Sequence, residues 1–322
     1  MSAEGSRRAI LAALLANIGI AVTKFIAWVL TQASSMLAES IHSVADASNQ
    51  VLLLVGRKRS NRAPTEEHQF GFGRERYVYA FIVAVVLFTV GGLFALYEAY
   101  HKYHELHSGA ENELLTSQWW WVPLVVLTVA IVMESFSLRT AVRESNHVRG
   151  ERSWKGFIQS EKSPELPVVL LEDTAALTGL VFALIGVGMT LLTDNAYWDV
   201  AGTVAIGILL VVVAVLLAVE TKSMLLGEAG TVQAVQRIRA ALENEPRVER
   251  VIHLRTMHLG PDDLLVVTKI AVRHDESAID VARAIDAAEQ RIREAEPVAR
   301  WVYIEPDIYQ VGHETDARPV VH

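Results

Sequence analysis

The sequence predicts a membrane-embedded bundle of six helices followed by a small soluble α+β domain. The chain has 322 residues, of which 52% are hydrophobic, and its long apolar runs all lie in the first 225 residues. The residues that follow are charged and show the periodicity of a soluble fold. We therefore expect a transmembrane domain over residues 1–225, a soluble domain over 226–312 and a disordered tail over 313–322.

Six segments have the length of about 20 apolar residues that a helix needs to cross a bilayer core. They are Ile10–Leu30, Met36–Val55, Tyr77–Tyr97, Trp119–Leu138, Leu166–Leu192 and Trp198–Val219. The first run contains Asn17 and Lys24 and is longer than the apolar part of a typical signal peptide. We expect it to be a retained span.

Basic residues alternate between the connections of these spans. They precede the first span and fill the second-to-third and fourth-to-fifth connections, whereas the other connections carry Lys102 as their single basic residue. Because basic loops stay in the cytoplasm, this pattern predicts a multi-pass membrane protein with both termini cytoplasmic. In a bacterial host it would lie in the inner membrane.

Residues 98–118 are expected to form a loop on the outer side. His101, His104 and His107 are spaced by three residues there, and such a triplet can gather cations. A solvated polar loop is the simpler interpretation, because three histidines in a loop are weak evidence for a metal site.

The last hundred residues predict the order αββαβ. A helix over Val232–Leu242 precedes strands over Arg247–Met257 and Leu264–Val272, and a helix over Ala278–Ala295 precedes a strand over Trp301–Ile304. This order indicates a ferredoxin-like sandwich with the helices on one face of the sheet. The net charge of -8 and the absence of a basic stripe argue against a nucleic-acid partner.

The second span contains a polar stripe. Glu39, His42, Asp46 and Asn49 follow one another about one helical turn apart on a single face. Because an ionisable residue inside a span costs roughly 2.5–3.5 kcal/mol on insertion scales, each of these residues is a candidate functional group.

The fifth span contains the adjacent carboxylates Glu172 and Asp173. Protonation or a bound cation would relieve their repulsion, and one imidazole with several carboxylates suits Zn²⁺, Co²⁺, Mn²⁺ or Fe²⁺, with Zn²⁺ favoured by the imidazole. The alternative is that these groups only pair with one another between helices. Glu134 and Lys24 are weaker candidates, because snorkelling or a salt bridge can satisfy them.

Four motifs carry a resemblance to a known family. They are Ser35-Met-Leu-Ala-Glu-Ser-Ile-His-Ser-Val-Ala-Asp46, Glu66-Glu-His-Gln-Phe-Gly-Phe-Gly-Arg74, His253-Leu-Arg-Thr256 and Ile304-Glu-Pro306. In this order and on this topology, the chain resembles the cation diffusion facilitator family over most of its length. The Glu172-Asp173 pair and the basic second loop are most similar to the branch of the mitochondrial zinc transporter nine.

The resemblance implies a homodimer that exports Zn²⁺ or a similar ion from the cytoplasm in exchange for protons. Its transport site would be tetrahedral, and His42, Asp46 and Asp173 match family ligands. The family usually has His or Asp four residues before that aspartate, where this chain has Val169. Glu172 or Asn49 would have to replace the missing ligand.

The resemblance also bears on the soluble domain and the loop before it. Phe72 stands where the family often has a histidine, although His68 remains, and Thr268, Lys269, Tyr303 and Glu305 occupy positions near which other members bind zinc. We therefore expect the soluble domain to bind metal weakly or not at all and to act mainly in dimerisation.

Two other classes of function compete with transport. A scaffold or regulator that keeps the fold without transport would explain Val169. A membrane-embedded enzyme has little support, because the sequence contains no HExxH, Walker or nucleophile-elbow motif. The divalent ion is expected to be a substrate, and no prosthetic group is expected.

Overall fold

The computed structural model describes residues 2–31, 34–109 and 119–309. The predicted disordered tail over 313–322 lies outside these residues. The chain forms two compact units, one made of Met1–Arg59 with Glu75–Lys222 and the other of Ser60–Arg74 with Ser223–His322. The domain limits that we place at residues 225 and 312 stay predictions.

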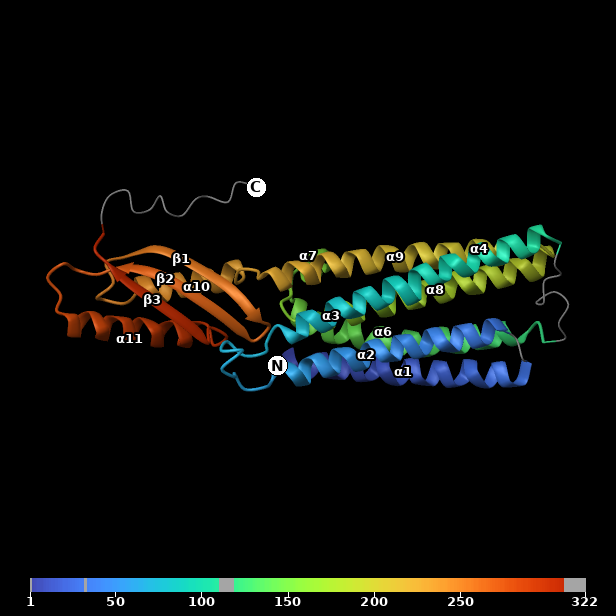
Figure 1. Ribbon diagram of the computed structural model, residues 1–322, viewed down its shortest axis with the longest axis horizontal. Helices are drawn as coiled ribbons and strands as arrows, with labels where there is room; N and C mark the ends of the chain where they lie inside the picture. Colours follow the sequence, from blue (N-terminus) through green and yellow to red (C-terminus); the bar gives the residue numbers. More distant parts are fainter. Residues whose placement is uncertain (1, 32–33, 110–118, 310–322) are drawn as a thin grey trace. The chain divides into compact units, whose positions relative to one another are not determined.

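The first unit is a bundle of long helices (Figure 1). Its elements are α1 (Ser2–Thr31), α2 (Ser34–Ser60), α3 (Glu75–Val86), η1 (Leu87–Leu93), α4 (Phe94–His107), α6 (Val122–Arg149), α7 (Trp154–Ser160), α8 (Glu165–Thr193) and α9 (Tyr197–Leu226). Each of the six predicted spans coincides with one long helix or, for the third span, with the continuous stretch α3–η1–α4. The all-α membrane fold is therefore confirmed.

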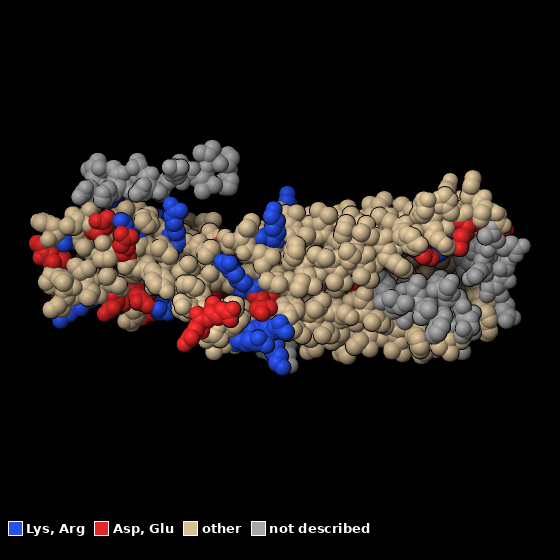
Figure 2. All heavy atoms as spheres, viewed as in Figure 1, with Lys and Arg blue, Asp and Glu red and all other residues tan. Residues whose placement is uncertain are grey.

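Four helical stretches in the described part of the chain are long and apolar enough to cross a membrane. They are Glu75–His107, Val122–Arg149, Glu165–Thr193 and Tyr197–Leu226, and α1 adds a shorter apolar segment, Leu14–Ile26. On the face drawn in Figure 2, charged side chains are sparse along the middle of the long helices. The helix α2 falls outside this group because polar residues interrupt its apolar run and basic residues end it.

The C-terminal end of the third predicted span corrects one expectation. The helix α4 continues to His107, so residues 98–107 are helical and do not form the predicted loop. The tyrosines of α4 have the same spacing of three residues as its histidines, so the two sets of rings lie next to each other along the helix. The ring centroids of Tyr100 and His104 are 4.3 Å apart. The side chains of His101, His104 and His107 are exposed.

The core of the helix unit places α6 and α8 side by side. The helix α6 packs against both α1 and α8. Fully buried apolar side chains from α3, α7 and α8 form one cluster, which includes Val83, Phe157, Leu166 and Val169. The short helix α7 was missed in the sequence, and Ser153 caps it by accepting a hydrogen bond from the amide of Gly156 at 3.0 Å.

The second unit has the predicted order αββαβ. Its elements are α10 (Val232–Glu243), β1 (Arg250–Gly260), β2 (Asp263–Ala271), α11 (Ala278–Ala295) and β3 (Trp301–Asp307). The sheet order is β1-β2-β3, with β2 antiparallel to β1 and parallel to β3. Both helices pack on the sheet and on each other, around Ile238, Leu264 and Ile292. The α+β fold is confirmed.

The loop between α2 and α3 packs on this sheet as part of the second unit. Phe70 meets Trp301 edge to face, with ring centroids 5.3 Å apart. A Cβ atom added to Gly73 would lie 2.8 Å from the carbonyl oxygen of Leu259 and 3.0 Å from Cα of Gly260. Glycine is therefore required here by close backbone approach.

Candidate metal site in the helix bundle

Polar side chains of α2 and α8 meet inside the bundle. The amides of Asn49 and Gln50 donate hydrogen bonds to the two carboxylate oxygens of Glu172, at 2.8 and 2.5 Å. All three side chains are buried. Glu172 therefore ties α8 to α2. Sequence reasoning missed Gln50, because it followed only the helix face that carries Asp46 and Asn49.

Asp173 points toward a different helix. Its Oδ2 accepts a hydrogen bond from the hydroxyl of Ser137 on α6 at 2.7 Å, and its Oδ1 is buried without a hydrogen-bond partner in the described structure. Successive residues of a helix are about 100° apart around its axis, so Glu172 and Asp173 contact different neighbours. Asp173 thus keeps one buried oxygen that can bind a ligand.

The bundle encloses a cavity of about 60 Å³, which is lined by residues of α1, α2, α6, α8 and α9. Its polar lining comes from Asn17, Lys24, Ser43, Asp46 and Glu134. Because a cavity needs only about 10–15 Å³ to hold one water molecule, it has room for an ion or water.

The burial of Lys24 and Glu134 excludes snorkelling, one of the two ways in which we expected their charges to be satisfied. Their side chains are 4% and 2% exposed, so neither snorkels to the membrane surface. The ammonium of Lys24 donates a hydrogen bond to the hydroxyl of Ser43 at 3.0 Å.

The carboxylates of the bundle form one electrostatic group. Glu134 is close enough to be repelled by Asp173, Asp46 and Glu172, whereas Lys24 acts on it in the opposite direction. Asp46 also repels both Glu172 and Asp173. Because Glu134, Glu172 and Asp173 are buried, an excess of negative charge is costly there, and a cation would reduce that cost.

The structure describes the side chain of Val169, the position of the missing ligand, but not that of the predicted ligand His42. His42 lies on α2, but its side chain falls outside the described structure, as does that of Glu39. Val169 is fully buried in the apolar cluster and offers no ligand atom. Within the described residues, no group of three or more histidines, aspartates or glutamates has the geometry of a metal site.

The beginning of α8 is fixed by a buried ion pair with α3. The guanidinium of Arg76 donates to both carboxylate oxygens of Glu165, and it donates to the hydroxyl of Ser163 at 3.3 Å. The side chains of Arg76 and Glu165 are 5% and 0% exposed. This pair sets the position of α8 about two turns before Glu172 and Asp173.

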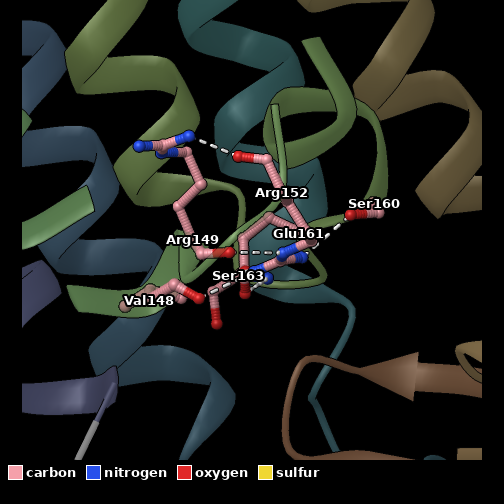
Figure 3. Close-up of polar contacts among 6 residues, drawn as sticks. All are labelled: Val148, Arg149, Arg152, Ser160, Glu161 and Ser163. Carbon is pink, nitrogen blue, oxygen red and sulfur yellow. Dashed lines mark hydrogen bonds and ion pairs between the residues drawn. The ribbon is translucent and has the colours of Figure 1, made fainter. Parts of the chain in front are cut away.

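The connection from α6 to α8 is held by a second arginine (Figure 3). The guanidinium of Arg152 donates hydrogen bonds to the carbonyl oxygens of Val148 and Arg149, to the hydroxyl of Ser160 and to the carboxylate of Glu161. These bonds fix the path of the connection between the end of α6 and the beginning of α8.

The bundle, its buried carboxylates and the αββαβ unit define a membrane transport protein of the cation efflux type. The chain belongs to the cation diffusion facilitator family, because the family described as "Cation efflux transmembrane domain" matches residues 10–226. This match confirms the resemblance seen in the sequence. It also places the chain in a class of transporters and not in a class of enzymes.

Curated relatives agree with the branch that the sequence predicted. The chain is 31% identical to the human "Proton-coupled zinc antiporter SLC30A9, mitochondrial" over 260 residues, which are 80% of this chain and 44% of that protein. It is 28% identical to "Metal tolerance protein C4" of Arabidopsis thaliana over 80% of this chain and 55% of the relative. The chain thus spans about half the length of these relatives.

Two further comparisons are with proteins of lower sequence identity. The chain is 21% identical to "Manganese efflux system protein MneP" of Bacillus subtilis, over 87% of this chain and 89% of that protein. A nickel form of a MamM CTD variant is 21% identical and covers 24% of this chain and 96% of its own, with a TM-score of 0.23.

Proposed function

We propose that this chain exports Zn²⁺ or a similar divalent ion from the cytoplasm in exchange for protons. The observation that carries this proposal is the group of mutually repelling carboxylates on α2, α6 and α8, in which the buried Asp173 keeps an oxygen without a hydrogen bond among the described residues. The name of the relative SLC30A9, a proton-coupled zinc antiporter, supports the same substrate and coupling.

His42, Asp46 and Asp173 are the proposed ligands on α2 and α8. Glu172 has both oxygens engaged by amides, so it binds the ion only if one amide is released. A carboxylate only accepts hydrogen bonds, so the amide of Asn49 turns its nitrogen, and not its oxygen, toward Glu172. The oxygen of Asn49 has no hydrogen-bond partner among the described residues and is a candidate further ligand.

Proton exchange follows from the chemistry of this ligand set. Imidazole and carboxylate ligands bind a metal ion in their deprotonated forms, so protons arriving from the acidic side compete for the ligands and release the ion. A site that opens alternately to each side by rocking of helix bundles then exchanges metal for protons. The ion is a substrate in this scheme.

We also propose the remaining features that the family implies. The protein is a multi-pass homodimer with both termini in the cytoplasm, in the inner membrane if its host is bacterial. Residues 226–312 form its cytoplasmic domain and serve mainly in dimerisation.

Flux measurements in proteoliposomes test this function. With an imposed pH gradient, wild-type protein should transport Zn²⁺, whereas Asp46→Asn and Asp173→Asn should not. Asp199→Asn is a matched control, because Asp199 lies at the start of α9 and pairs with Lys102 at 3.2 Å, away from the cavity lining. Transport that survives collapse of the pH gradient would exclude proton exchange.

The competing class, a scaffold without transport, makes the opposite prediction. Val169 is its main support, since the usual ligand position is apolar and fully buried. If folded wild-type protein moves none of Zn²⁺, Mn²⁺, Co²⁺ and Fe²⁺, the scaffold interpretation replaces the transporter.

A further inference from the structure

We propose that Glu134 of α6 is a metal ligand of the transport site, so that the site is built from three helices. This inference rests on the proposed function and extends it. Glu134 supplies the oxygen that Val169 of α8 cannot supply.

The first argument is that Glu134 is buried while its carboxylate accepts no hydrogen bond from the described residues. Its side chain is 2% exposed, and within the described residues its carboxylate accepts no hydrogen bond and forms no ion pair. Buried polar groups are nearly always hydrogen-bonded, and an ionised carboxylate without a partner is especially costly to bury. Glu172, Asp173 and Glu165 all accept hydrogen bonds, so Glu134 stands apart from the other buried acids of the bundle.

The second argument is the cavity. Glu134 lines the space of about 60 Å³ together with Asp46, one of the proposed ligands on α2. An unpartnered carboxylate on one wall and a second carboxylate on another are the arrangement that a divalent cation bridges. Lys24 lines the same cavity, and its ammonium partly balances these acids when no metal ion is bound.

The third argument is the direction in which α6 presents its polar residues. Glu134 and Ser137 are three residues apart and therefore lie on one face of the helix. The hydroxyl of Ser137 donates a hydrogen bond to Oδ2 of Asp173, with 2.7 Å between the two oxygens. This face of α6 is therefore turned toward α8. Glu134 also lies close enough to Asp173 for their charges to repel each other.

The fourth argument comes from α8 itself. The turn before Asp173 carries Val169, which is fully buried among apolar side chains such as Leu166. No rotation of that side chain provides a ligand atom. A ligand from α6 fills the coordination sphere without any distortion of α8.

Binding measurements on the purified full-length protein in lipid nanodiscs test the proposal. Equilibrium dialysis with Zn²⁺ alone would compare wild type with Glu134→Gln, which keeps the size of the side chain and removes its charge. Loss of a ligand should weaken binding by about tenfold or more, as loss of even an outer-shell partner commonly does. Asp199→Asn is the control and should bind like wild type.

A second variant guards against misfolding. If Glu134→Gln is not monodisperse by gel filtration, Glu134→Asp decides the question, because it keeps the charge and withdraws the oxygens by one methylene. Weaker binding by this variant supports ligation by Glu134. Binding equal to wild type in either folded variant overturns it.

The outcomes separate this inference from the proposed function. If wild type neither binds nor transports any divalent ion, both fall together. If wild type binds and transports Zn²⁺, Asp46→Asn does neither, and Glu134→Gln binds like wild type, the two-helix site stands and only the role of Glu134 is wrong.

Discussion

In the helix unit, Asp46 and Glu134 line one cavity, and Asp173 lies close enough to repel Glu134. In the second unit, Lys269 binds the carboxylates of Glu305 and Asp307 near the surface. The distances from the Lys269 ammonium to these carboxylates are 3.0 and 3.1 Å. In the second unit, one lysine of β2 thus pairs with two carboxylates of β3, whereas in the bundle the carboxylates around Glu134 repel one another.

This difference indicates where an external cation is needed. The acids of the bundle repel one another in an apolar environment, and under the proposed function a divalent ion would relieve that repulsion. At the sheet, the ammonium of Lys269 already occupies the place of a cation. The comparison gives a physical reason for the expectation that the soluble domain binds metal weakly, which stays a prediction.

The largest effect is expected from breaking the buried ion pair of the helix unit. Arg76→Met leaves Glu165 buried without its bidentate partner, which should lower the free energy of unfolding by about 3–5 kcal/mol. Arg273→Met is the matched control, because Arg273 pairs with Asp275 at 2.9 Å with both side chains more than half exposed. Thermal unfolding of the purified protein in detergent measures both.

If Arg76→Met and Arg273→Met unfolded at the same temperature, the buried ion pair would contribute no more to stability than the exposed one. Loss of transport by Arg76→Met without loss of stability would instead show that the pair acts only in positioning α8.

A smaller and more local effect is expected in the second unit. Gly73→Ala places a methyl group against the backbone of Leu259 and Gly260, and such overpacking costs about 1–3 kcal/mol. Hydrogen exchange should rise in residues 60–74. Gly188→Ala in α8 is the control, since its added Cβ meets nothing within 4 Å and alanine favours a helix. Equal exchange in wild type and Gly73→Ala would contradict the close packing.

Much of this architecture follows from local sequence patterns. Apolar length predicts the six long helices, and alternation predicts β1 and β2 to within about three residues. Both signals depend on one segment at a time. The π-helical segment Leu87–Leu93 and the short helix α7 were missed, because neither changes the apolar pattern enough to be seen.

The site was predicted less completely than the fold. The pattern of α2 and α8 identifies Asp46, Glu172 and Asp173, since charged residues stand out in an apolar run. It does not give the rotation of each helix in the bundle. For that reason the hydrogen bonds of Glu172 and the burial of Glu134 could be found only from the packing of α6 and α8.

The smallest effect is expected at Lys269, and it should depend on pH. Hydrogen bonds to Glu305 and then to Asp307 raise the pKa of Lys269 above its ordinary value of 10.5. A raised lysine pKa stabilises the fold fully below the ordinary value, and the contribution is lost as the pH rises through the folded value. Lys269→Met should thus unfold at a slightly lower temperature than wild type at neutral pH, and the difference should shrink as the pH rises beyond the ordinary lysine value of 10.5. Lys155→Met, at an exposed lysine of α7, should show no such trend. A difference that stayed constant as the pH rose would mean that Lys269 acts through its packing and not through its charge, and the contrast with the acids of the bundle would lose its electrostatic basis.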